Sequence, residues 1–220
     1  MVGPQNVNAS RELILARVRR ARAQPVAATP AARAYRRRGA RDRAARIDLL
    51  CDRIGDYRAD VRRVPTTALP GAIAEAFAAR NATRVCVPAG IPPQWRSDAI
   101  EFVEDTELTA GELDRLDGVL TGCTLAIAET GTVVLAAGPT EGRRALTLVP
   151  DLHVCVVGEE QVVELVPEAM DALAELVRTE RRPLTFISGP SATSDIELSR
   201  VEGVHGPRTL VVLVVAQELP

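Results

Sequence analysis

Hydrophobic residues in the second half of the chain gather in short runs that alternate little with polar residues. Four runs rich in Val, Leu and Ile span 132–136, 152–157, 184–188 and 209–216. Such runs are typical of strands covered on both faces. A helical pattern over 167–178 separates the second run from the third. The alternation of strand and helix predicts βαβ crossovers and a largely parallel sheet.

The middle of the chain continues this alternation with shorter elements. Residues 70–80 have the spacing of a helix with Ile73 and Phe77 inward, and 84–87 is a strand that a proline-rich turn ends. A further strand over 99–103 and a short helix over 109–116 are expected.

Two helices are predicted in the N-terminal part, on either side of a Pro/Ala-rich linker at 24–32. The first spans 10–22, with Ser10 as its N-cap. The second spans about 40–59 and carries an apolar stripe, which we interpret as packing on its own domain, with a partner-binding helix as the alternative. The stripe consists of Ile47, Leu50, Ile54, Tyr57 and Val61. We therefore expect a basic helical extension at 1–63 and an α/β domain at 64–220.

Charge is distributed unevenly, although the formal net charge is only −2. The chain has no lysine, and 16 of its 27 arginines lie within 11–63 beside six acidic residues, an excess of +10. A basic arm on an acidic body is one feature of nucleic-acid binders, but the aromatic residues that stack on bases are nearly absent. We expect the arm to fold against its own acidic body or an acidic partner, and expect no nucleic-acid binding.

Cysteine spacing and hydropathy limit the class of protein further. Cys51, Cys86, Cys123 and Cys155 are each more than thirty residues from the next and lie in apolar stretches, so we interpret them as buried free thiols and expect no iron–sulfur cluster, zinc or other cofactor. No apolar run reaches the roughly 18 residues of a membrane span. Residues 1–10 lack the features of a secretory signal, which favours a cytoplasmic location.

Polar, glycine-bearing segments beside the predicted strands are the candidate ligand loops. The first, with Glu129, Thr130, Gly131 and Thr132, presents a carboxylate, hydroxyls and backbone N–H groups. A plain glycine turn is the alternative interpretation. We expect this turn to share one crevice with the segment 188–195, at the C-terminal ends of neighbouring strands.

The segment 188–197 leaves a predicted strand and enters a short helix. Ser194 and Glu197 have the spacing of a capping box, so helix initiation alone explains them; the alternative is that the helix N-terminus and nearby hydroxyls bind a phosphate or carboxylate. The candidate ligand-binding residues here are Ser188, Gly189, Pro190, Ser191, Thr193 and Asp195.

A third segment, 203–208, adds His205 and Gly206 as candidate ligand-binding residues. With His153, Asp195 and Glu197, His205 offers the residue types of a metal site. We expect no metal there, because a site needs a complete ligand set brought together in space.

Five stretches are distinctive when these segments are taken together: TGC at 121–123, AIAETGT at 126–132, residues 144–150 with His153, SGPSATSDIE at 188–197 and GVHGP at 203–207. Their combination resembles the LUD-domain family, most closely its lactate-utilisation protein C type. The resemblance covers about residues 118–216 and implies a Rossmann-like α/β fold similar to the NagB/RpiA/CoA-transferase superfamily.

The resemblance also implies a role in bacterial L-lactate oxidation to pyruvate, beside cysteine-rich iron–sulfur partner subunits. This chain has neither cluster-ligand spacing nor a G-x-G-x-x-G fingerprint, so we expect a non-redox subunit that binds a small anionic ligand. One alternative is a CoA-transferase-like enzyme with Glu129 as nucleophile. Another is a ligand-sensing or scaffold protein, so whether the chain is an enzyme stays open at this point.

Overall fold

The computed structural model describes residues 4–23, 34–190 and 206–216, and these divide into two units between Tyr35 and Arg36. Helix α1 (Pro4–Arg22) belongs to the first unit. It begins six residues before Ser10, so the expected N-cap lies inside the helix; proline suits the first turn because its missing N–H has no helical partner there. The expected linker at 24–32 lies outside the described residues.

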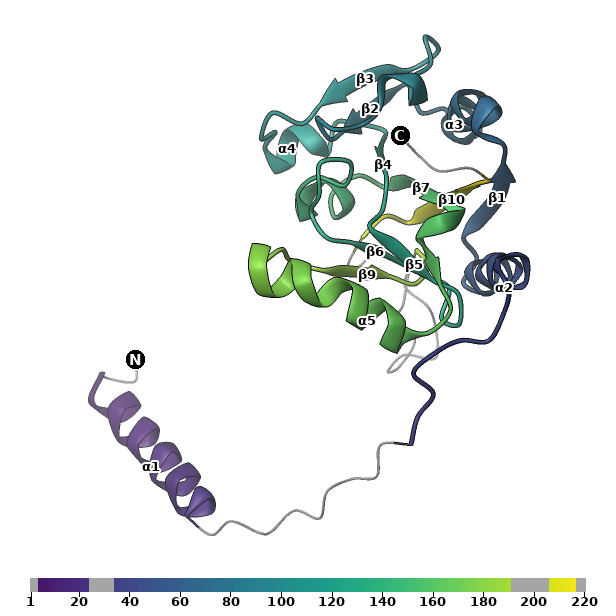
Figure 1. Cartoon of the computed structure of the whole chain (residues 1–220). Helices are drawn as coiled ribbons and strands as arrows, with labels where there is room; N and C mark the ends of the chain where they lie inside the picture. The colour runs from purple at the N-terminus through teal and green to yellow at the C-terminus, as the bar shows by residue number, and fades with distance from the viewer. Residues whose placement is uncertain (1–3, 24–33, 191–205, 217–220) are drawn as a thin grey trace. The chain divides into compact units, whose positions relative to one another are not determined.

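A six-stranded parallel sheet is the centre of the second unit (Figure 1), and it confirms the predicted α/β class. All five pairings within it are parallel. In spatial order its strands are β1 (Asp60–Val64), β10 (Thr209–Val215), β7 (Leu152–Gly158), β4 (Gly118–Thr121), β2 (Arg84–Val87) and β3 (Glu101–Glu104).

A smaller sheet corrects the expectation that all four apolar runs of the second half lie in one parallel sheet. Its strands, in spatial order, are β8 (Val162–Val163), β5 (Leu125–Ile127), β6 (Thr132–Leu135) and β9 (Thr185–Ile187). The β5–β6 and β6–β9 pairs are antiparallel. Only four residues join β5 to β6, and so short a connection makes a hairpin, whereas a parallel pair needs a crossover of a dozen residues or more.

Helices cover both faces of the six-stranded sheet, and the smaller sheet and α5 lie beyond one of these faces (Figure 1). The two main cores lie on opposite faces of the six-stranded sheet. Alternate residues of β7 face opposite sides: Val154 and Val156 pack with helix α3 (Leu69–Ala78), whereas Cys155 and Val157 pack with α2 and the smaller sheet. Helix α5 (Val166–Glu175) covers the outer face of the smaller sheet through Leu173. A π-helical turn, Leu176–Glu180, follows it where the predicted helix continued to 178.

Helix α2 (Arg43–Asp56) belongs to this second unit, which confirms its interpretation as a packing helix. Ile47, Leu50 and Ile54 are fully buried. The helix ends before the expected residue 59, close to Arg58, which adopts a left-handed conformation with φ 63°. The last member of the expected stripe, Val61, lies instead in β1, so the division expected at residue 63 falls within a strand of the central sheet.

The remaining expectations for the middle of the chain hold with small shifts. Strand β2 matches the predicted 84–87, and β3 begins two residues later and ends one residue later than the predicted 99–103. The helix expected over 109–116 is the shorter α4 (Ala110–Leu113). Strand β4 and the short strands β5 and β8 were not predicted. No helix in the described ranges has both the length and the apolar character needed to cross a membrane.

Candidate functional site

The turn from Glu129 to Thr132 joins the two strands of the β5–β6 hairpin and packs against α2. Gly131 has φ +58°, and a Cβ atom there would lie 2.7 Å from the carbonyl carbon of Arg53 in α2. Only glycine fits both the left-handed backbone and this close approach. The glycine therefore fixes where the neighbouring threonine side chains stand.

Three hydroxyl groups meet beside this turn. The Oγ1 atoms of Thr130 and Thr132 are 2.7 Å apart, and Thr132 Oγ1 is 2.7 Å from Ser188 Oγ. The antiparallel register that pairs Val133 with Ile187 brings Thr132 beside Ser188. The two predicted segments thus meet, but where β6 begins and β9 ends in the smaller sheet, not at the C-terminal ends of parallel neighbours.

The other described members of the predicted site lie against different parts of the structure. Gly189 has φ +89°, and a Cβ atom there would lie 2.5 Å from Cβ of Tyr57, just beyond the end of α2. Pro190 and Gly206 are half-buried, and a Cβ atom on Gly206 would lie 3.7 Å from the carbonyl oxygen of Thr147. Ser191, Thr193, Asp195 and His205, with Ser194 and Glu197, lie outside the described residues.

Glu129 holds its carboxylate at the surface, where it forms an ion pair with Arg36. Its side chain is 42% exposed. The same guanidinium lies 4.0 Å from the buried carboxylate of Glu164, which Arg41 also binds, at 2.7 Å. Arg43 and Arg63 pair with Glu159 in the same way. The basic segment therefore folds against the acidic body over residues 36–63, as its charge predicted.

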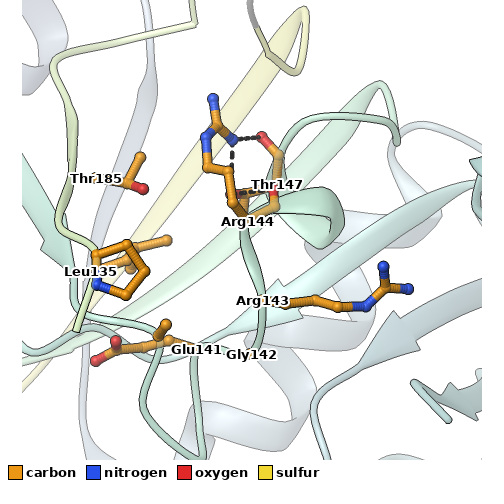
Figure 2. Close-up of a pocket in the computed structure, with 9 residues that line it drawn as sticks. Leu135, Glu141, Gly142, Arg143, Arg144, Thr147 and Thr185 are labelled. Atoms are coloured by element: carbon orange, nitrogen blue, oxygen red, sulfur yellow. Dashed lines mark hydrogen bonds between the residues drawn. The ribbon is translucent and has the colours of Figure 1, made fainter. Parts of the chain in front are cut away.

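A small pocket lies between the start of the 3₁₀ helix Arg144–Thr147 and strand β9 (Figure 2). The guanidinium of Arg144 donates to the carbonyl oxygen and to Oγ1 of Thr147, at 2.7 and 3.0 Å, while Arg143 points away (Figure 2). Partial burial lowers the pKa of Arg144. The volume of about 10 Å³ suffices for a single water molecule.

Glu141 on the opposite wall of this pocket is buried and fully engaged. Its carboxylate accepts hydrogen bonds from Oγ1 of Thr124 at 2.6 Å and from the backbone N–H groups of Ala136 and Gly138 at 2.5 and 3.0 Å. A carboxylate that accepts this many bonds is a structural anchor for the 136–142 loop. Glu141 was not among the predicted site residues.

A buried polar cluster between β4 and β7 was also missed. Oγ1 of Thr121 lies 2.7 Å from Nε2 of His153, while Nδ1 of His153 is buried with no hydrogen-bond partner in the described part of the chain. Thr121 stands opposite Cys155 in the parallel register, and the Cys155 thiol donates to the carbonyl oxygen of Gly122. The signal was present in the sequence as TGC at 121–123 and HVC at 153–155, but only the pairing of β4 with β7 joins them.

The thiols of Cys123 and Cys155 interact within this cluster. The hydrogen bond between the two thiols, with smaller contributions from His153 and Thr121, lowers the pKa of the Cys155 thiol, and the same hydrogen bond together with burial raises the pKa of Cys123. All four cysteines are free thiols, and three are buried, as predicted; Cys51 is half-buried. Within the described ranges, no three Cys, His, Asp or Glu side chains are arranged to hold a metal ion.

These features define an α/β protein with polar loops on a small second sheet, and comparisons with known proteins place it in a family. A family model for the LUD domain matches residues 90–215. The lactate utilization protein C of Deinococcus radiodurans is 56% identical over 165 residues, which cover 74% of this chain and 76% of that protein. The lactate utilization protein C of Bacillus velezensis is 31% identical over 121 residues, or 52% of this chain and 50% of that one.

A solved structure agrees with these sequence relatives. The crystal structure of a DUF162 family protein from Deinococcus radiodurans superimposes with a TM-score of 0.71 at 48% sequence identity, covering 80% of this chain and 100% of the other. This chain belongs to the LUD domain family. The resemblance inferred from the sequence motifs is thereby confirmed.

Proposed function

We propose that this chain serves bacterial lactate utilisation as a non-redox subunit that binds a small carboxylate at the Thr130, Thr132 and Ser188 hydroxyl cluster. The observation that carries the proposal is the hydrogen-bonded chain of these three hydroxyls where two ligand-loop candidates meet. Hydroxyl groups can rotate to donate to a carboxylate or to a substrate hydroxyl. The names of the relatives in Deinococcus and Bacillus support lactate utilisation as the setting.

The redox step of lactate oxidation is assigned in this proposal to iron–sulfur, cysteine-rich partner subunits. The four cysteines of this chain are dispersed along the sequence without the spacing of cluster ligands. We expect the chain isolated without oxygen to contain no stoichiometric iron or zinc, and to co-purify with a cluster-bearing subunit from cells grown on lactate. A cluster absorbance from the isolated chain would contradict the assignment.

Binding and growth test the site itself. L-lactate, pyruvate and phosphate are titrated while thermal unfolding is followed; a true ligand at a hundredfold excess over its dissociation constant adds about 2.7 kcal/mol to the free energy of unfolding. Thr132→Val and Ser188→Ala should abolish this shift and fail to restore growth on L-lactate to a strain lacking the gene.

The exposed Thr106→Val variant, in the loop after β3, is the matched control and should behave as wild type in both assays. If the Thr132 and Ser188 variants bind and grow like the control, the hydroxyl cluster is only structural and the proposed site is wrong.

A second candidate function is acyl transfer by Glu129, favoured by the exposure of its carboxylate beside the hydroxyl cluster. In such a reaction the carboxylate would attack the carbonyl carbon of an acyl-CoA thioester, and the carbon–sulfur bond would break. CoA thiolate would depart as the leaving group, and Glu129 would carry the acyl group as an anhydride. If Glu129 transfers acyl groups, the purified protein should turn over acyl-CoA, and Glu129→Gln should abolish that turnover. Lactate binding that survives Glu129→Gln without any turnover favours the first proposal, or a sensing role.

A further inference from the structure

A larger pocket lies on the other side of the central sheet, away from the smaller sheet. Its walls come from the segment that follows β1, from the start of α3, and from the 3₁₀ helix Pro93–Trp95 that follows β2. We call it the carboxyl-edge pocket, since both segments leave the C-terminal ends of parallel strands, where open α/β sheets commonly bind ligands. Its volume is about 430 Å³, within the range of small-molecule sites. The lining residues are Thr66, Thr67, Leu69, Pro70, Gln94 and Trp95.

One wall of the carboxyl-edge pocket carries a polar atom that nothing in the described structure explains. Oγ1 of Thr66 is buried and has no hydrogen-bond partner there. Burying a hydroxyl group without a hydrogen bond costs free energy, so such a group indicates a partner that is not part of the described structure. Rotation about χ1 exchanges the hydroxyl and methyl positions of a threonine, which lets Thr66 offer its hydroxyl to a molecule in the pocket.

The electrostatics of the pocket favour one negative charge. Helix α3 begins at the pocket with Leu69 and Pro70, and it has neither a side-chain cap nor an acidic residue in its first turn. The N-terminal end of a helix carries a partial positive charge that attracts anions. None of the six lining residues is charged, so no carboxylate of the pocket wall repels an anion and no cation of the wall suits a doubly charged phosphate.

Beside the polar side chains of Thr67 and Gln94, the remainder of the pocket surface is apolar. Leu69, Pro70 and the indole of Trp95 supply it, and Trp95 is only 3% exposed. We propose that the carboxyl-edge pocket binds a monocarboxylate with an apolar body larger than lactate, the carboxylate at Thr66 and the start of α3, the body against Trp95. The carboxylate end would accept a hydrogen bond from the Thr66 hydroxyl, and the hydrocarbon would leave water.

Trp95 makes the test direct, because it is the single tryptophan of the chain. Acetate, butyrate, hexanoate and octanoate are titrated into the full-length protein while tryptophan fluorescence is recorded. The expected result is a saturable change whose affinity rises with chain length, because each buried methylene adds favourable transfer energy. Hexanol and hexylamine, which share the body but not the charge, should bind at least tenfold more weakly.

Variants separate a ligand site from a structural pocket. Thr66→Val keeps the shape and removes the hydroxyl; it should weaken hexanoate binding about tenfold or more, as expected for one hydrogen bond to a charged group. The melting temperature of the free protein should stay the same or rise, since an unpaired buried hydroxyl is lost. Thr66→Ser should retain binding.

Two outcomes would overturn the proposal: no saturable fluorescence change with any carboxylate, or equal affinity of wild type and Thr66→Val. The Thr132→Val variant should leave hexanoate binding unchanged. Failure at the carboxyl-edge pocket is thus distinguishable from failure of the proposed function at the hydroxyl cluster.

Discussion

At the scale of single residues, Glu164 is the most buried of the acidic residues that hold the arginine-rich segment against the domain. Its side chain is 2% exposed, and its two oxygens accept from the backbone N–H and the guanidinium of Arg41, each at 2.7 Å. The hydrogen bond from the Arg41 backbone, followed by that from its side chain, lowers the pKa of Glu164 below its ordinary 4.5 against the opposing effect of burial. A buried carboxylate with these partners contributes to stability only while it is ionised.

Acid should therefore weaken the fold through Glu164. A carboxyl group whose folded pKa lies below its unfolded pKa contributes fully above about pH 4.5, and that contribution is lost as the pH falls through the folded value. Urea unfolding at pH 7 should show Glu164→Gln less stable by about 2 kcal/mol, the usual size for hydrogen bonds to a charged group. The variant should also lose less stability than wild type as the pH falls below about 4.5.

The exposed pair of Glu175 and Arg178, 2.9 Å apart, supplies the control. Glu175→Gln should change the free energy of unfolding by less than about 1 kcal/mol, because exposed ion pairs contribute little. Equal losses in the two variants would show that burial of Glu164 has no energetic consequence.

At the scale of elements, the β5–β6 turn and α2 meet at a backbone contact that the hydroxyl cluster depends on. The turn approaches α2 at Gly131, where a side chain would meet the backbone of Arg53. Helix α2 is itself held by Ile47, Leu50 and Ile54 in the core. The position of Thr132 relative to Ser188 is thus set by how a hairpin packs on a helix.

A comparison of Gly131→Ala with a glycine replacement elsewhere distinguishes this contact from the general effect of replacing glycine. We expect Gly131→Ala to lower the free energy of unfolding by roughly 1–3 kcal/mol, because alanine is strained at positive φ and its Cβ would press on α2. The control is Gly55→Ala in α2, where an added Cβ would have nothing within 4 Å. It should leave the free energy of unfolding unchanged or raise it by up to about 1 kcal/mol. Chemical denaturation of both variants is the measurement, and equal effects would contradict the packing argument.

At the scale of the whole molecule, the boundary of the folded domain lies at residue 36 and not at residue 63. The compact unit starts at Arg36, and α2 and β1 are parts of it. Strand β1 pairs with β10 along its full length, from Asp60 with Val211 to Val64 with Val215. A chain cut at residue 63 would lose a strand and a core helix of this unit.

Truncation distinguishes the two boundaries. A protein that begins at Arg36 should unfold cooperatively with a melting temperature within a few degrees of the full chain, since a compact unit with its own core can fold alone. A protein that begins at Val64 should fail to fold or aggregate, because β10 is left as an exposed apolar edge. Circular dichroism melting and gel filtration check both, and a stable product of the shorter cut would refute the structural boundary.

The sequence by itself determined those elements whose signal is local. The apolar runs 152–157 and 209–216 contain few polar residues, which indicated strands covered on both faces. The strands that they form, β7 and β10, lie in the interior of the central sheet. The stripe of α2 predicted a packed helix, and the motifs around 121–132 and 188–207 indicated the LUD family, because these patterns are read within a few residues.

Only the tertiary structure decided which distant segments meet. The runs that form β6 and β9 look like β7, yet a short hairpin and antiparallel register put them in a second sheet. Thr132 reaches Ser188 across 56 residues of sequence, and Thr121 reaches His153 across 32. The carboxyl-edge pocket likewise joins Thr66 to Trp95. A side chain's own neighbours in sequence cannot specify such partners, because strand register and layer packing are chosen by the burial of the whole core.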